Sequence, residues 1–297
     1  MTKLKRFLRS SARPALKLLV ASLILSSCSS STTPTYPTES MAEAIEDVSR
    51  KEYNTQVSAR LVGQTLWVYV PVEGLLERAQ KPQKYTEKFS AEHDTKDIAD
   101  SGIFKIRYNI TPISEKEKYQ LYTYNKEAVE KINGVWRVLR RVIFSTDRRT
   151  GKQPVFFCFV TADIKTGFEV RELFYLLDLK KLYYEYISWG EYQHRATQES
   201  TVSPEIVGDR TGAHLDYRDV TMKEFIVKQI NHRIQLKFQK PEVEQSADID
   251  KEILKIAVHT IRMYNFRDFS VLQLDNAFTR RTLVLNSDEV WANPVVE

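Results

Sequence analysis

The chain has 297 residues and a formal net charge of +5 at pH 7; 42% of its residues are hydrophobic and 28% are charged. This balance predicts a packed core and argues against a disordered chain. Residues 1–27 contain six cationic side chains and no acidic one, so subtracting these six from +5 leaves a net charge of −1 for the remainder. Nucleic-acid-binding proteins need a basic surface that neutralises phosphates, and this sequence therefore excludes nucleic acid as the partner.

The N-terminal segment has three parts in a fixed order. Basic residues between Lys3 and Lys17 come first, the apolar run 18–25 follows, and Leu25-Ser26-Ser27-Cys28 ends the segment. The apolar run is too short to cross a bilayer, because a spanning helix needs roughly 20 apolar residues. It is typical of a targeting segment that is removed by processing. An uncleaved N-terminal anchor is the alternative interpretation.

The segment Leu25-Ser26-Ser27-Cys28 resembles the lipobox of bacterial lipoproteins. The resemblance implies a signal peptide at 1–27 and a Cys28 that carries diacylglycerol and, after cleavage, a further acyl chain such as palmitate. Two or more acyl chains attach a protein stably to a membrane, whereas a single chain does so only marginally. Ser29 is similar to the residue that sorts such lipoproteins to the outer membrane. The implied location is the cell envelope, at the periplasmic face of the outer membrane, with the inner membrane as the alternative.

The second cysteine, Cys158, lies in the apolar run 155–160. Once Cys28 is acylated, no intramolecular disulfide can form, and a zinc site built from cysteines is excluded. A nucleophilic cysteine needs an electropositive and partly exposed surrounding, which this run does not offer. The sequence therefore predicts that Cys158 is a small buried core residue.

Residues 29–40 are rich in Ser and Thr, contain two prolines and lack apolar periodicity. This composition is typical of a flexible tether. The predicted organisation is a signal peptide at 1–27, the lipidated cysteine and tether at 28–40, and an α+β body at 41–297, with a division into two subdomains at about 41–200 and 201–297 left open.

The body begins with a predicted helix and two strands. Ser40-Met41-Ala42-Glu43 fits a capping box, which predicts a helix from there to about Lys51. Alternating apolar residues then predict strands at 57–61 and 66–70. Residues 77–100 are polar and charged, and we expect an excursion or a mobile loop there. A further strand is predicted at about 104–110.

The middle of the chain repeats this order. Asn125 can cap a helix whose apolar residues recur in steps of three and four as far as Ile143. Strands are predicted at 155–163 and 168–177, a third strand at 182–187, and a short helix follows a second capping box at Ser188.

The last third contains two predicted helices and three strands. Thr221 caps a helix that runs to about His232, and Asp248 or Asp250 opens another that runs to about Tyr264. The predicted strands lie at 234–239, 269–274 and 282–285.

Three segments therefore share the order helix, strand, turn, strand, near 40–71, 125–177 and 248–286, although their residues barely align. This order suggests a duplication. Hairpins of alternating strands favour antiparallel pairing. The predicted fold is α+β, an antiparallel sheet with helices packed on one face, built from helix–strand–strand units.

The best candidate for chemistry is the polar segment 208–219. His214 and Asp216 would face the same side of an extended segment. Together with Asp209 or Asp219, they could form a metal site or a general base with its orienting acid. A surface loop is the favoured interpretation, because a metal site needs three or four ligands and this spacing matches no known motif. No catalytic, cofactor-binding or metal-binding residue is therefore assigned.

Aromatic residues crowd one region of the middle of the chain. If 182–187 is a strand, Tyr184 and Tyr186 share one face, where they could stack on glycan rings or dock a protein partner. Packing against neighbouring elements is the favoured alternative. The residues of this cluster are Phe174, Tyr175, Tyr183, Tyr184, Tyr186, Trp189 and Tyr192.

These observations favour a non-catalytic binding or assembly component of the envelope, anchored to the membrane through Cys28, with an envelope protein or glycan as its partner. A lipoprotein hydrolase that uses the His214 and Asp216 loop is one alternative. A carrier with a lipid or small molecule between sheet and helices is the other. The chain contains no Gly-x-Ser-x-Gly elbow and no glycine-rich phosphate loop, so an enzyme is not favoured and no cofactor is expected.

Overall fold

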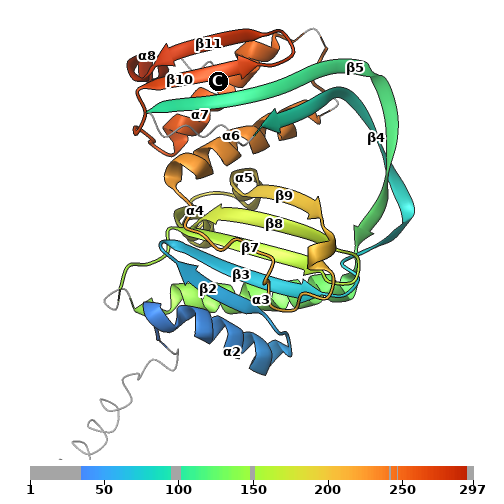
Figure 1. Cartoon of the computed structure of the whole chain (residues 1–297), viewed down its shortest axis with the longest axis vertical. Coiled ribbons are helices and arrows are strands. Elements are labelled where there is room, and N and C mark those ends of the chain that lie inside the picture. The colour runs from blue at the N-terminus through green and yellow to red at the C-terminus, as the bar shows by residue number, and fades with distance from the viewer. Residues whose placement is uncertain (1–34, 95–101, 148–150, 241, 246, 293–297) are drawn as a thin grey trace, which may run out of the picture.

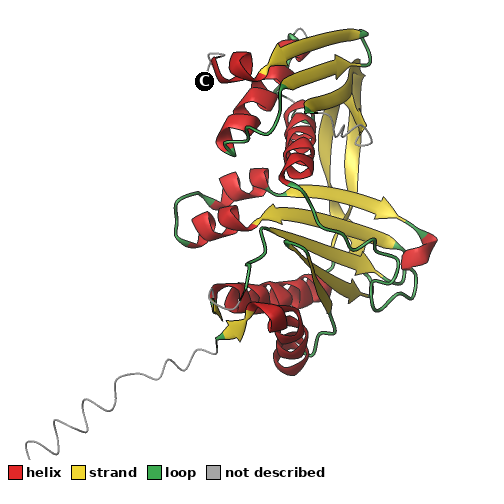
Figure 2. Cartoon of the chain, turned by 60° about the vertical axis from the view of Figure 1, so that its left-hand side comes forward, coloured by secondary structure: helices red, strands yellow, loops and turns green. Residues whose placement is uncertain are grey.

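The computed structural model describes residues 35–94, 102–147, 151–240, 242–245 and 247–292. The predicted signal peptide and Cys28 lie outside these residues. The described chain forms an α+β fold with seven α-helices and three sheets (Figure 2), which confirms the predicted fold class. None of its described helices is both long and apolar enough to span a membrane.

The larger sheet has five strands and is mixed. The parallel pair β3–β7 lies at its centre, and the other neighbours are antiparallel, so the expectation of a purely antiparallel sheet is wrong in this detail (Figure 1). In spatial order the strands are β2 (Ser58–Val62), β3 (Thr65–Val72), β7 (Phe156–Asp163), β8 (Phe168–Tyr175) and β9 (Thr197–Val202).

Two long helices cover one face of this sheet, α2 (Met41–Tyr53) and α3 (Lys126–Phe144). The Asn125 side chain accepts hydrogen bonds from the backbone of Glu127 and Ala128, which confirms the predicted cap of α3. The predicted capping box of α2 is wrong, because the Ser40 side chain accepts no hydrogen bond from the helix backbone; its hydroxyl donates to the carbonyl of Pro37 instead. Two shorter helices, α4 (Leu176–Tyr183) and α5 (Trp189–Arg195), follow β8.

The second sheet has four strands with the same pairing pattern. Its central pair β10–β5 is parallel and each outer pair is antiparallel, as in the order β2-β3-β7-β8. The strands are, in spatial order, β11 (Arg281–Asn286), β10 (Val271–Asn276), β5 (Ile103–Tyr124) and β4 (Leu76–Asp94).

The helices α7 (Ile249–Met263) and α8 (Ser287–Ala292) accompany the second sheet. The three predicted helix–strand–strand units are confirmed as α2-β2-β3, α3-β7-β8 and α7-β10-β11. The Asp248 side chain caps α7 by accepting a hydrogen bond from the backbone N–H of Lys251. Strands from both sides of residue 200 form the second sheet, because β4 and β5 pair with each other and β5 pairs with β10.

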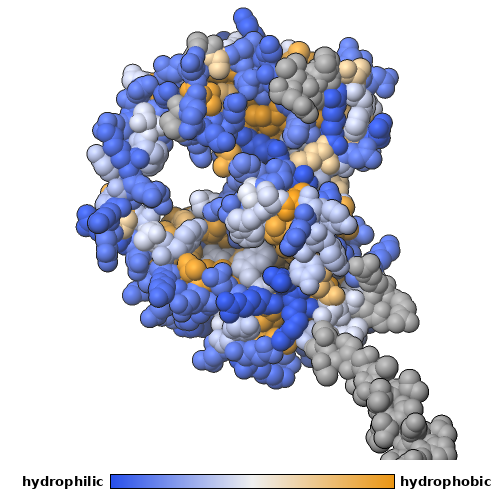
Figure 3. Space-filling view, turned by 180° about the vertical axis from the view of Figure 1, so that it is seen from behind, coloured by the Kyte–Doolittle hydropathy of each residue, from blue (hydrophilic) through white to orange (hydrophobic). Residues whose placement is uncertain are grey.

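The region expected to be a polar excursion contains β4, so that prediction is wrong for residues 77–94. Beyond the second sheet, β4 and β5 continue as a two-stranded ribbon, which we call the arm and define as residues 76–87 and 116–124. Figure 3 shows an opening between this arm and the rest of the molecule. Both faces of the ribbon meet solvent, and the alternation of apolar and polar residues that reveals a half-buried strand is therefore absent.

The helix α6 (Met222–Phe238) lies between the two sheets, and its core contacts include residues of both. Buried residues occur all around it, including the consecutive Phe225, Ile226 and Val227, as expected of a central helix. The predicted strand at 234–239 is wrong because α6 continues through it. Ile234 and Phe238 extend the face of Ile230 at steps of four, a pattern that a short window does not separate from strand alternation.

Two further predictions are corrected. The predicted strand at 182–187 is the end of α4 and the following loop, and the strand beside β8 is instead β9. The predicted tether extends too far, because β1 (Tyr36–Pro37) pairs with β6 (Thr146–Asp147) and a 3-10 turn follows at Thr38–Ser40. The packed body therefore begins at Tyr36 and not at Met41.

Candidate functional site

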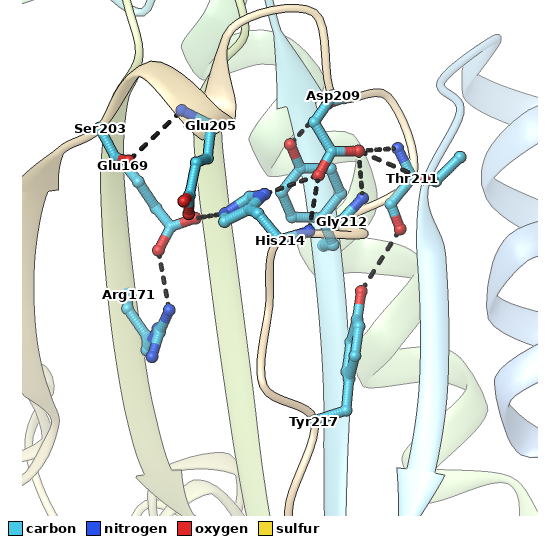
Figure 4. Close-up of polar contacts among 10 residues, drawn as sticks. Glu169, Arg171, Ser203, Glu205, Asp209, Thr211, Gly212, His214 and Tyr217 are labelled. Carbon is cyan, nitrogen blue, oxygen red and sulfur yellow. Dashed lines mark hydrogen bonds and ion pairs between the residues drawn. The ribbon is translucent and has the colours of Figure 1, made fainter.

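The predicted polar segment packs on the face of the five-stranded sheet that is opposite α3. His214 lies between two carboxylates there (Figure 4). Its Nδ1 is 2.6 Å from Oδ2 of Asp209, and its Nε2 is 2.7 Å from Oε2 of Glu169 on β8. Glu169 is almost completely buried, and Arg171 donates a 3.0 Å hydrogen bond to its other oxygen.

The backbone of the loop fixes Asp209. One of its carboxylate oxygens accepts hydrogen bonds from the backbone N–H groups of Thr211 and Gly212, both at 2.9 Å. The Tyr69 hydroxyl donates to the Asp209 carbonyl at 2.6 Å. Gly212 has φ +73°, and a Cβ there would overlap the hydroxyl of Tyr217 and the ring of Tyr69. Only glycine fits this turn without strain.

The charges of the cluster support each other. Burial lowers the pKa of His214, but hydrogen bonds and charge from Asp209 and Glu169 outweigh it, so the net pKa lies above the ordinary value. Burial raises the pKa of Asp209, but the hydrogen bonds from His214 and the loop backbone outweigh it and hold that pKa well below its usual range. This geometry describes an imidazolium between two carboxylates. Both ring nitrogens are engaged, so neither can accept a substrate proton unless an ion pair breaks first.

The structure does not bring His214 and Asp216 together in one site, although the sequence suggested that they share a face. Asp216 is exposed and lines a small cavity of about 100 Å³ with Arg218 and Glu224, whereas the carboxylates that His214 contacts are those of Asp209 and Glu169. Asp219 accepts hydrogen bonds from the backbone of Gln64 and the hydroxyl of Thr65, and so it holds the β2–β3 turn. Within the described ranges, no group of three or more His, Cys, Asp and Glu side chains is arranged to hold a metal ion.

Sequence reasoning missed Glu169, which is 45 residues from His214 in the chain. A charged residue at an inward position of a strand was the available signal. Cys158 is a buried free thiol, as predicted, and burial raises its pKa to about 12. Such a thiol stays protonated at neutral pH and is a poor nucleophile.

The opposite face of the same sheet contains a second candidate site that the sequence did not indicate. It is a cavity of about 230 Å³ at the base of the arm, between the sheet and α3. Aliphatic side chains form much of its lining, and Glu172 on β8 is its one acidic side chain. The lining residues are Leu75, Tyr124, Val129, Ile132, Thr161, Val170, Glu172 and Gln198.

Glu172 has no compensating partner. Across the described chain, its carboxylate makes no hydrogen bond or ion pair, and burial raises its pKa to about 7. Burial also raises the pKa of Tyr124 and Tyr192, and the charge of Glu172 adds to both shifts. The Tyr192 hydroxyl is buried without a hydrogen-bond partner among the described residues. A carboxylate left unpaired in this way costs stability, so Glu172 marks a place in the cavity where a ligand could supply the missing contacts.

The structure divides the predicted aromatic cluster. Phe174 and Tyr192 stack in the core, as the favoured interpretation predicts. Tyr184, Tyr186 and Trp189 are instead exposed by 57%, 79% and 62%, although the Tyr184 ring contacts Phe144 and Tyr183 and the Trp189 ring contacts Tyr192.

Next to these exposed rings lies a groove of about 420 Å³ at the C-terminal end of α3. Three arginines and two aromatic rings dominate it. Its lining residues are Arg137, Arg140, Arg141, Phe144, Ser145 and Tyr183.

Comparisons of the chain with protein-family profiles, with curated proteins and with solved structures found no match.

Proposed function

We propose that this chain is a lipid-anchored, non-catalytic binding or assembly component of the bacterial cell envelope, held at the periplasmic face of the outer membrane. The observation that carries the proposal is the N-terminal order of basic residues, short apolar run and Leu25-Ser26-Ser27-Cys28. Acyl chains on Cys28 would hold the body at a membrane surface without a spanning helix.

The arm supports binding as the task of the body. It exposes both faces of a two-stranded ribbon and carries the exposed rings of Tyr85, Tyr119 and Tyr122. Amphipathic tyrosine rings are enriched in protein interfaces. The hydrolase alternative has less support, because the two carboxylates beside His214 occupy both of its ring nitrogens.

Labelled palmitate tests the anchor directly. Cells that produce the full chain should incorporate label into it, and the Cys28→Ser variant should not. Cys158→Ser is the matched control, because it removes the other cysteine and should leave labelling unchanged. An unlabelled wild-type chain, or label that persists on Cys28→Ser, would refute acylation at Cys28.

A photo-reactive amino acid at Tyr122 tests the arm as the binding surface. We expect a discrete cross-linked envelope protein or glycan from this position in intact cells. The same amino acid at Val284, an exposed position on β11, is the control. Equal cross-linking from both positions would count against the arm.

A second candidate function is the binding of a small molecule between the sheet and α3, and the cavity beside Glu172 favours it. An unpaired carboxylate among aliphatic side chains suits a small amine with an apolar body. Cyclohexylmethylamine should therefore bind more tightly than cyclohexylmethanol, and Glu172→Gln should remove that preference. Glu205→Gln, an exposed change on the other side of the sheet, is the control. If neither compound binds at millimolar concentration, this second function is refuted.

A further inference from the structure

The position where the tether joins the body is fixed. β1 begins at Tyr36, and the backbone N–H of Tyr36 donates a 3.1 Å hydrogen bond to the carbonyl of Ser145, just after α3. Only seven residues separate Cys28 from Tyr36. Even fully extended, this stretch spans at most about 28 Å. If Cys28 is acylated, this end of the body lies close to the membrane.

A basic groove is located at the same end. Ser145, which binds the first strand, also lines the groove with Arg137 and Arg140. Both arginines are exposed, and neither forms an ion pair with any described residue. Arg141 is different, because it is paired with Glu52 through two hydrogen bonds. Two uncompensated guanidinium groups therefore face solvent beside the tether.

Exposed aromatic rings continue the groove. Phe144 stacks on Tyr183 at 4.2 Å between ring centroids, and the Arg140 guanidinium lies 5.0 Å from the centre of the Tyr183 ring. Tyr184 and Tyr186 follow in the loop after α4, and Trp189 is the first residue of α5. Glu185 is the single acidic residue between Tyr184 and Trp189. Tyrosine and tryptophan are enriched at the headgroup level of membranes, where one part of the ring is apolar and the other is wet.

We infer that Arg137, Arg140, Tyr184, Tyr186 and Trp189 form a membrane-contact surface whose arginines bind the phosphates of anionic phospholipid. This inference rests on the proposed acylation of Cys28. Each cation near an anionic bilayer strengthens attachment about five-fold, and guanidinium binds phosphate in a bidentate manner. Figure 1 places the second sheet at the end of the molecule farthest from the N-terminal strand, so this contact would direct that sheet away from the bilayer.

Fluorescence quenching in vesicles tests the surface. The acylated full chain is reconstituted into vesicles that contain phosphatidylglycerol and brominated phospholipid. We expect the brominated lipid to quench tryptophan emission, and the quenched component should be lost in Trp189→Phe. The double variant Arg137→Gln, Arg140→Gln should reduce the quenched fraction at least two-fold. Arg280→Gln, Arg281→Gln removes the same charge from the opposite end of the body and should leave quenching unchanged.

The outcomes separate the surface from the anchor. If mass spectrometry finds the acyl chains and the protein floats with the vesicles, but Trp189 is not quenched, the surface is refuted and the anchor stands. Equal effects of the two arginine double variants would also refute it. A chain without acyl groups that does not float refutes the anchor, and the surface with it.

Discussion

At the residue scale, the position of His214 between Asp209 and Glu169 predicts how stability changes with pH. The pKa of His214 is raised in the folded protein, so the ion pairs contribute fully below the unfolded pKa of about 6.5 and are lost as the pH rises through the folded pKa. We expect the free energy of unfolding to fall on the alkaline side of pH 6.5, which urea denaturation between pH 5 and 9 can measure.

The His214→Asn variant should lose that pH dependence and about 2–3 kcal/mol of stability at pH 6, because the buried Glu169 then keeps Arg171 as its only charged partner. His194→Asn is the matched control, since His194 is exposed on α5. If both variants lose the same small amount of stability, the ion pairs of His214 contribute nothing measurable.

Glu172 also makes stability fall as the pH rises, but the cause is burial of an unpaired carboxylate and not the loss of an ion pair. Its folded pKa is raised from 4.5 to about 7, so the folded state holds the proton longer than the unfolded chain does. This contribution to stability is therefore largest below about pH 4.5 and falls as the pH rises towards 7. Glu172→Gln should raise stability at pH 8 by about 2 kcal/mol and remove that fall. A variant that is less stable than the wild type at pH 8 would contradict this account.

At the scale of elements, one buried carboxylate connects three helices. The Asp178 carboxylate on α4 accepts one hydrogen bond from Arg195, at 2.8 Å, and another from the hydroxyl of Tyr264, at 2.9 Å. Arg195 belongs to α5, and Tyr264 directly follows α7. Asp178→Ala should cost about 2–3 kcal/mol in urea denaturation, because it leaves the Tyr264 hydroxyl without its partner and leaves the partly buried Arg195 with Glu191 alone.

The surface pair of Asp47 and Arg50 provides the comparison for this prediction. Asp47→Ala should cost less than about 1 kcal/mol, since exposed ion pairs contribute little. Similar losses for the two variants would show that Asp178 does not hold the helices together.

The elements that could be predicted from sequence are those with local signals. Asn125 and Asp248 cap helices through hydrogen bonds within three residues, so these starts can be read from the chain. The end of α6 could not be predicted in this way. Ile234 and Phe238 are apolar because the helix packs between two sheets, and this tertiary contact leaves no local signal. The arm was missed because neither of its faces is buried, and no apolar alternation marks it.

The candidate sites follow the same division. The turn around Asp209 and Gly212 is local, and the sequence indicated a polar loop there. The contact of His214 with Glu169 joins a loop to a strand, and the cavity at Glu172 joins a strand, a helix and the base of the arm. Such sites depend on tertiary contacts between distant residues, which a single sequence does not reveal.

At the scale of the whole molecule, we expect the core to stay folded and assembled when the chain is cut within the arm. A protease site inserted between Gln80 and Lys81 falls where residues 79–82 lack paired partners in the ribbon. After cleavage, the fragments should remain together in size-exclusion chromatography, because all eight residues of β3 pair with β7 and Leu66 and Val68 are fully buried. Fragments that separate without denaturant would contradict the prediction.

The parallel pairing of β5 with β10 has a consequence for the order of folding. Ile103 pairs with Val271, so during synthesis one edge of β5 stays unpaired until a strand roughly 170 residues later in the chain has been made. Pairings between such distant residues form slowly, and an open strand edge invites pairing with other chains. The four-stranded sheet is therefore completed last, and a nascent or truncated chain that ends before residue 271 would depend on chaperones to stay out of aggregates.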